Sequence, residues 1–138
     1  MSLVFQMGSA LNAIGKKMRT GFSTEKIVIQ PSQFGLLVYI SKDKDVIQTE
    51  LASLLDRDKS AVLREIDILE ENGLVRRVND AVDRRKKFVI ITDKGKKVLK
   101  HGTLLIDKMM NELLDGLPEN EKEIFYKVLV HLENKARQ

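Results

Sequence analysis

Lysine and arginine side chains are concentrated in residues 76–100. This stretch holds ten Lys and Arg against three acids, a local charge of +7, whereas the whole chain of 138 residues carries +4. Cationic side chains gathered in one stretch bind phosphate groups well, because each neutralised phosphate releases counterions. A basic run is also often an ordinary solvated surface. The helices and strands around it must therefore indicate whether it binds phosphate. The ten are Arg76, Arg77, Arg84, Arg85, Lys86, Lys87, Lys94, Lys96, Lys97 and Lys100.

The composition argues against several other kinds of chemistry. The chain has no cysteine, which excludes disulfides, thiolate catalysis and cysteine-based zinc or redox sites. Its two histidines, His101 and His131, lie about 30 residues apart without a neighbouring pair of acids, and no glycine-rich phosphate loop is present. We therefore expect no enzyme, no cofactor and no metal site.

Length and hydropathy set the class of protein. With 138 residues, of which 43% are hydrophobic, the chain suits one domain over residues 1–138 with a substantial core. No run approaches the ~20 apolar residues of a transmembrane helix. The N-terminal text MSLVFQMGSALNAIGKKM lacks the basic start and long apolar core of a signal peptide. We expect a cytoplasmic protein without membrane contact.

The segment Gln48–Thr92 predicts two helices joined by a short turn, followed by two strands with a basic loop between them. Asp58 suits the N-cap of the second helix, and Gly73 suits its left-handed end. This order is that of a winged helix-turn-helix, which places its second helix in a DNA major groove. The face of that helix expected to be buried contains Val62, Ile66 and Leu69.

The start of the second helix and the loop between the strands predict two contacts with DNA. Ser60 and the free N–H groups of the helix start can hold a phosphate, and Arg64 can reach guanine or a phosphate. In the loop, an arginine at the tip can enter the minor groove. The acid Asp83 is interpreted as a brace that orients Arg85 or Arg77; the alternative is a loop salt bridge of little energetic value.

Further helices are predicted on both sides of this segment. Pro31 suits the first turn of a buried helix, a very short strand is predicted at Val46–Ile47, and Thr92 suits the cap of a helix over 93–115. Inward side chains are predicted at Phe34, Leu37, Val38 and Ile40, and at Leu51, Ala52, Leu54 and Leu55. The apolar faces of the two strands are predicted to come from Val75, Phe88, Ile90 and Ile91. The predicted fold class is mostly α with a small β-hairpin wing.

Apolar residues at helical spacing mark both ends of the chain. Residues 4–22 form one such stripe, for which burial in the core of the same chain and a dimer interface are both open interpretations. Another stripe follows Pro118. Packing of both ends against those of a second chain would bury all the stripes together. The expected dimerisation residues are Val4, Met7, Leu11, Ile14, Ile124, Val128 and Leu132.

Three stretches between Glu50 and Gly95 read ELASLLDRDKSAVLREIDILEENGLVRR, DRR and FVIITDKG. They resemble the MarR family of bacterial transcription regulators, whose pattern has an ELA..L helix, a DKS.V.R..D.LE..GLV.R recognition helix and turn, a D.R wing and a closing LT..G. The register runs without a gap, and PSQF at 31–34 resembles the family's entry to its second helix. The resemblance implies a winged lobe over 30–95 and helical dimerisation regions over 1–24 and 96–138.

The resemblance also implies a function. Members of the family are homodimers on pseudo-palindromic duplex sites, usually repressors, and often bind small aromatic acids. It implies base or phosphate contacts for Ser60, Ala61 and Arg64, a wing arginine at Arg85 and a bracing acid at Asp83. The full set expected at DNA is Ser32, Gln48, Thr49, Lys59, Ser60, Ala61, Leu63, Arg64, Arg84, Arg85 and Lys86, with Asp83 and Arg77 bracing the wing.

The chain departs from the family pattern at three positions. Leu63 replaces a small polar residue, Asn79 a common proline before the wing, and Ile91 a leucine. No specific ligand motif is present for a small aromatic or anionic effector. Arg19, Tyr39, His101 and the methionines are candidate liners, with core or surface roles as the alternative. The competing function is a winged helix that contacts proteins and does not bind DNA.

Overall fold

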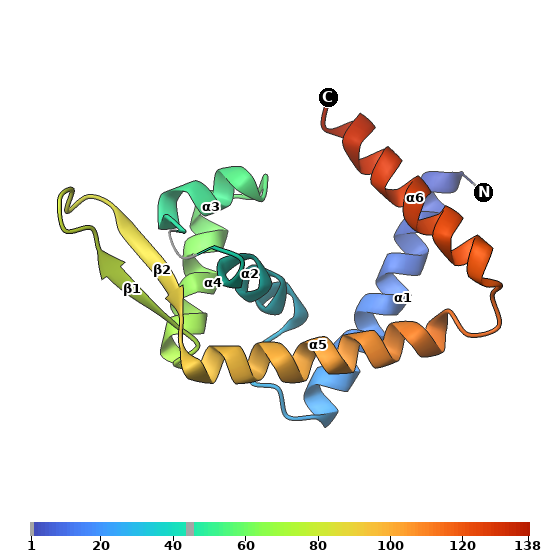
Figure 1. Cartoon of the computed structure of the whole chain (residues 1–138), viewed down its shortest axis with the longest axis horizontal. Coiled ribbons are helices and arrows are strands. Elements are labelled where there is room, and N and C mark those ends of the chain that lie inside the picture. Colours follow the sequence, from blue (N-terminus) through green and yellow to red (C-terminus); the bar gives the residue numbers. More distant parts are fainter. Residues whose placement is uncertain (1, 44–45) are drawn as a thin grey trace. The chain divides into compact units, whose positions relative to one another are not determined.

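The computed structural model describes residues 2–43 and 46–138, and over these residues it contains six helices and one two-stranded sheet (Figure 1). Two compact units are present, one up to Leu105 and one over Ile106–Gln138. The elements are α1 (Leu3–Thr24), α2 (Pro31–Ser41), α3 (Gln48–Leu54), α4 (Lys59–Glu71), β1 (Val75–Asn79), β2 (Lys87–Ile91), α5 (Asp93–Leu113) and α6 (Glu119–Ala136). The first unit therefore contains the predicted winged lobe together with α1 and the start of α5.

The core of the first unit is built from α2, α3, α4 and the hairpin. Phe22 at the end of α1 joins it, with its ring edge-to-face against Phe34 at 5.4 Å. Burial of the predicted side of α4 is confirmed, since Val62, Ile66 and Leu69 are fully buried. The core side chains are Phe22, Ile29, Phe34, Leu36, Leu37, Ile40, Val46, Leu51, Ala52, Val62, Ile66, Leu69, Leu74, Val75 and Val89.

The predicted burial of Leu54 is wrong, because this side chain is 56% exposed. Leu51 and Ala52 already fill the inward side of the seven-residue helix α3. The chain then turns at Asp56, whose φ is +51°. Val38 and Leu55, also predicted inward, are half-buried. In so short a helix, two buried positions suffice to hold it on the lobe.

The predicted ends of α4 and the start of α5 are confirmed. The Asp58 carboxylate accepts a hydrogen bond from the Ala61 amide at 3.0 Å, and Gly73 has φ +73°. At the start of α5, the Thr92 hydroxyl accepts from the Gly95 amide at 3.0 Å and donates to the Gly73 carbonyl at 2.6 Å. The same hydroxyl therefore caps α5 and ties its start to the end of α4.

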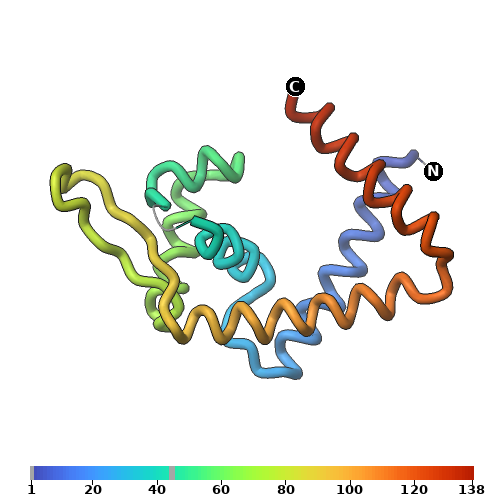
Figure 2. The backbone as a smooth tube through the Cα atoms, viewed as in Figure 1, coloured from blue at the N-terminus to red at the C-terminus, as the bar shows by residue number. Residues whose placement is uncertain are grey.

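The two strands run side by side as an antiparallel hairpin (Figure 2). In its register, Val75 lies opposite Ile91 and Asn79 opposite Lys87. The short strand predicted at Val46–Ile47 is reduced to a single bridge from Ile47 to Phe88, supported by a bond from the Val89 amide to the Val46 carbonyl at 2.8 Å. The hairpin is thus fixed to the lobe along β2, while its loop extends away from the helices of the first unit (Figure 1).

The apolar stripe of α1 has two different environments. Val4 and Leu11 are 73% and 67% exposed, whereas Phe22 is buried in the core. Met7, Ile14 and Met18 between them are half-buried. Burial in the core of the same chain is therefore confirmed for the end of the stripe. The beginning of the stripe carries uncovered apolar side chains, and a dimer interface there stays a prediction.

The second unit consists of the end of α5, a turn and α6. Gly116 in the turn has φ +88°. No residue of α6 is buried, and its predicted stripe is exposed, from 57% at Ile124 to 38% at Leu132. Among the described residues, no helix is long and apolar enough to span a membrane.

Candidate nucleic-acid interface

The first half of α4 presents a polar surface to solvent. Lys59, Ser60 and Arg64 are exposed, whereas Ala61 and Leu63 are half-buried beside them. Within the described residues, the side chains of Lys59 and Arg64 have no hydrogen-bond or ion-pair partner. These cations are therefore available to an external anion.

The turn before α4 is held by an ion pair. Arg57 lies 2.9 Å from Glu65, whose side chain is 15% exposed and projects from the second turn of α4. The hydrogen bond to Glu65 raises the pKa of Arg57 above its ordinary value, with a further coulombic contribution from the same carboxylate. This pair fixes the turn against α4, and it leaves Arg57 charged at every physiological pH.

The wing loop is folded by the two aspartates within it. Asp80 accepts from the Val82 amide at 2.9 Å, and Asp83 accepts from the Arg85 amide at 3.0 Å. Such side-chain to backbone bonds are characteristic of Asx turns. The strands are closed by a bond from the Asp80 amide to the Lys86 carbonyl at 3.0 Å. Arg84, Arg85 and Lys86 remain exposed on this folded loop.

The interpretation that Asp83 orients the side chain of Arg77 is wrong, because that guanidinium is bound elsewhere. The described partner of Asp83 is the main-chain amide of Arg85, so its brace acts on the loop backbone and not on a guanidinium. The prediction assumed that an acid among many cations pairs with an arginine side chain of the hairpin. A short aspartate side chain in a loop reaches a backbone amide two residues ahead more readily.

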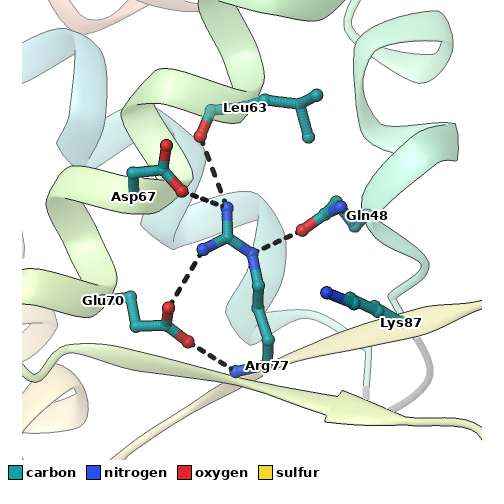
Figure 3. Close-up of a pocket in the computed structure, with 6 residues that line it drawn as sticks. All are labelled: Gln48, Leu63, Asp67, Glu70, Arg77 and Lys87. Carbon is teal, nitrogen blue, oxygen red and sulfur yellow. Dashed lines mark hydrogen bonds and ion pairs between the residues drawn. The ribbon is translucent and has the colours of Figure 1, made fainter.

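Arg77 instead joins three elements (Figure 3). From β1 its guanidinium contacts Asp67 at 2.6 Å and Glu70 at 3.0 Å, both on α4. It also donates to the side-chain oxygen of Gln48 on α3 and to the Leu63 carbonyl at 3.4 Å. Its own amide donates to Glu70 at 3.0 Å. With Lys87, these residues line an open hollow of about 460 Å³.

The sequence alone did not indicate this cluster. The available signal was the spacing of Asp67 and Glu70, which places two acids on neighbouring positions of one helix before an arginine in the next strand. The cluster also includes Gln48, a residue expected at DNA, whose side-chain oxygen accepts a hydrogen bond from Arg77. The other two candidates outside α4 and the wing, Ser32 and Thr49, are exposed near the starts of α2 and α3.

The candidate effector-lining residues do not share one described cavity. Tyr39 lines a partly enclosed cavity of about 350 Å³ at the end of α2, together with Val46, Glu50 and Leu54. His101 on α5 lies 3.3 Å from Glu25. Arg19 is exposed on α1. Since His101 and Arg19 do not line the Tyr39 cavity, the effector prediction remains without a located site.

The part of the chain that carries this surface is similar to a known family. The MarR family model matches residues 29–87, which include α2, α3, α4, β1 and the wing loop. This is the segment in which the sequence resembles that family, and it contains most of the exposed cations described above. Members of the MarR family are transcription regulators.

Solved structures share the fold over nearly the whole chain. MepR from S. aureus, solved in complex with DNA, has 23% sequence identity to this chain; the match covers 98% of each chain, with a TM-score of 0.84. CouR bound to a 23-mer DNA duplex is 22% identical, with coverage of 96% and 92% and a TM-score of 0.87. BldR from Sulfolobus solfataricus is 26% identical, with coverage of 96% and 93% and a TM-score of 0.79. A structure of CouR from Rhodococcus jostii RHA1 bound to p-coumaroyl-CoA is 21% identical, with coverage of 93% and 89% and a TM-score of 0.78.

Proposed function

We propose that this chain, a MarR-family protein by its residues 29–87, is a transcription regulator that binds duplex DNA as a homodimer. The observation that carries the proposal is the exposed start of α4, where Lys59 and Arg64 have no side-chain partner among the described residues. A helix start offers free N–H groups for a phosphate, and its first side chains can reach base edges. The exposed loop cations Arg84 and Arg85 add a second contact on the same unit.

The contacts divide into two classes. On α4, Arg64 is proposed to read a base edge or hold a phosphate, and Ser60 to hold a phosphate. In the wing, Arg85 is proposed to enter the minor groove, whose negative potential attracts arginine. The remaining residues proposed at DNA are Ser32, Thr49, Lys59, Ala61, Leu63, Arg84 and Lys86. We assign no catalytic role to the chain, and we propose a cytoplasmic location.

Assembly and regulation complete the proposal. Exposed apolar side chains on α1 and α6 support a homodimer, which would place two recognition helices on a pseudo-palindromic site. The mode of action is proposed as repression relieved by a small aromatic or anionic effector. The structure of CouR with p-coumaroyl-CoA supports the effector, since that relative of similar fold carries an aromatic, anionic ligand.

The test is binding to a pool of random duplexes, followed by selection of the bound sequences. We expect a site with two half-sites whose centres lie roughly one duplex turn, about 10 base pairs, apart. Binding to unselected duplex should weaken steeply between about 50 and about 200 mM salt. Binding to a protein partner without salt-sensitive binding to any duplex would instead support the alternative, a winged helix that serves only protein contacts.

A further inference from the structure

We infer that Arg77 is a positioning residue for DNA binding, which fixes the wing to the recognition helix and neutralises two carboxylates on the surface between them. The inference rests on the proposed function and concerns the same surface. Its basis is the cluster in Figure 3, where one guanidinium from β1 reaches Asp67 and Glu70 on α4 and Gln48 on α3.

The two carboxylates lie where DNA would be repelled. Asp67 follows Arg64 by three residues, so both occupy the exposed face of α4. Both carboxylates are substantially exposed: the Asp67 side chain is 54% exposed and the Glu70 side chain 41%. A phosphate backbone approaching this face meets two negative charges. Repulsion between like charges at an interface is costly, so the acids oppose binding unless a cation compensates them.

Arg77 supplies that compensation from a fixed position. Its side chain is only 17% exposed, and separate guanidinium nitrogens hold Asp67 and Glu70 at 2.6 and 3.0 Å. The Glu70 carboxylate is also held by the Arg77 amide at 3.0 Å. Lys87 lines the same hollow, and the four charged side chains sum to zero. The hollow therefore presents no net charge to a phosphate as long as Arg77 is in place.

The geometry requires arginine and not merely a positive charge. Four acceptors surround the guanidinium: a carboxylate from Asp67, one from Glu70, the Gln48 amide oxygen and the Leu63 carbonyl. A planar fork with five N–H donors can bind all of them from one position, whereas a lysine ammonium is a compact charge with three donors. The recognition helix, the start of α3 and the base of the wing are thereby held as one body.

The chain provides a matched control at the adjacent residue. Arg76 lies on the same strand with its side chain on the opposite face, since successive side chains of a strand alternate. It is exposed and has no hydrogen-bond or ion-pair partner among the described residues. Arg76→Met and Arg77→Met therefore remove the same charge from neighbouring positions, and only the second breaks the cluster.

The experiment measures binding of these full-length variants to a random-sequence duplex at two salt concentrations. Arg77→Met is expected to bind about tenfold more weakly than the wild type at about 50 mM salt, because two carboxylates are uncompensated. The loss should shrink at about 200 mM, where salt screens them. Arg76→Met should lose only about two- to threefold, the effect of one phosphate contact or less. Adding Asp67→Asn and Glu70→Gln to Arg77→Met should restore binding to the level of Arg76→Met.

The outcomes separate the inference from the proposed function. Equal losses of DNA affinity for Arg77→Met and Arg76→Met would overturn the role of Arg77 and leave the proposed DNA binding intact. The same holds if the triple variant, with Asp67→Asn and Glu70→Gln added, binds no more tightly than Arg77→Met. A wild type that binds no duplex would overturn the proposed function and this inference with it. If Arg77→Met fails to fold, Arg77→Lys is measured in its place. Lysine keeps the positive charge but lacks the planar guanidinium. Binding of DNA by Arg77→Lys with wild-type affinity would overturn the requirement for arginine.

Discussion

Arg64 and Arg85 carry the two kinds of DNA contact that we propose, and single substitutions distinguish them. Arg64 is exposed on α4 and unpaired within the described residues, so Arg64→Ala should leave the fold intact. If Arg64 reads a base, the variant loses about 1–3 kcal/mol on the selected site and relaxes the preference at one position in each half-site. Affinity for selected and mutated duplexes checks this, and an unchanged sequence preference would contradict base reading.

Arg85→Ala is expected to act differently. An arginine in the minor groove responds mainly to groove width and potential, so its loss should weaken selected and random duplexes by similar factors. The affinity should also depend less steeply on salt concentration, because the variant releases fewer of the counterions bound to DNA phosphates. A loss confined to the selected site would contradict this and would place Arg85 at a base edge.

Asp83 tests whether loop shape or charge dominates at the wing. Asp83→Ala removes the acceptor of the Arg85 amide, and a bond of this kind contributes about 1 kcal/mol. We expect weaker DNA binding, although the substitution removes a negative charge. Asp83→Asn keeps an acceptor oxygen without the charge, so it should bind at least as tightly as the wild type. Tighter binding by Asp83→Ala at low salt would show that the carboxylate only repels DNA.

At the scale of elements, the attachment of α5 depends on a glycine. A Cβ at Gly95 would lie 2.1 Å from the Leu74 carbonyl oxygen and 2.7 Å from Ile91. Because the nearest atom belongs to the backbone, no side-chain rotation relieves the clash. Gly95→Ala is expected to cost about 1–3 kcal/mol of unfolding free energy, as overpacking does.

A matched control for Gly95 is available in α2. A Cβ at Gly35 has nothing within 4 Å, so Gly35→Ala should stabilise the helix by about 0.5–1 kcal/mol. Urea unfolding of the two variants checks whether the free energy of unfolding falls for Gly95→Ala and rises for the control. A stability for Gly95→Ala equal to that of the wild type would show that α5 can shift away from the Leu74 carbonyl without cost.

Elements whose ends follow local rules could be predicted from the sequence. The cap at Asp58, the left-handed Gly73 and the cap at Thr92 each involve residues a few positions apart, and all three are confirmed. The partners of Arg77 could not be predicted in this way, since Gln48 lies 29 residues away in the chain. Their meeting depends on how α3 and β1 pack against α4, which periodicity does not encode.

The errors of prediction have the same origin. Leu54 has the spacing of an inward residue, but the length of α3 and the turn after it decide its exposure. Conversely, Val89 is fully buried although the apolar faces of the strands were predicted without it. The burial of its side chain shows that this face of the hairpin is covered by the lobe. Its amide also bonds to the Val46 carbonyl, which pairs the edge of β2 with the lobe. Which face of a two-stranded hairpin is covered depends on tertiary contacts.

At the scale of the whole molecule, we predict a homodimer formed through α1 and α6. The exposed apolar side chains include Val4, Leu11, Ile124 and Val128, and solvent exposure of this many is costly. The interface should bury more than about 2,000 Å² in total, as in obligate dimers. Light scattering at micromolar concentration measures the mass directly. A monomer under these conditions would rule out the proposed assembly and, with it, the two-fold site.

Val128→Glu tests which surface forms that dimer. Val128 is 46% exposed and α6 has no buried residue, so the variant should keep its helical content and its folded lobe. A charge in the centre of an apolar interface is strongly unfavourable, so we expect a monomer that binds a single half-site weakly. Asn134→Glu adds the same charge to the same helix on the opposite side from the stripe, and it should remain dimeric. If Val128→Glu also stays dimeric, the interface does not include this face of α6.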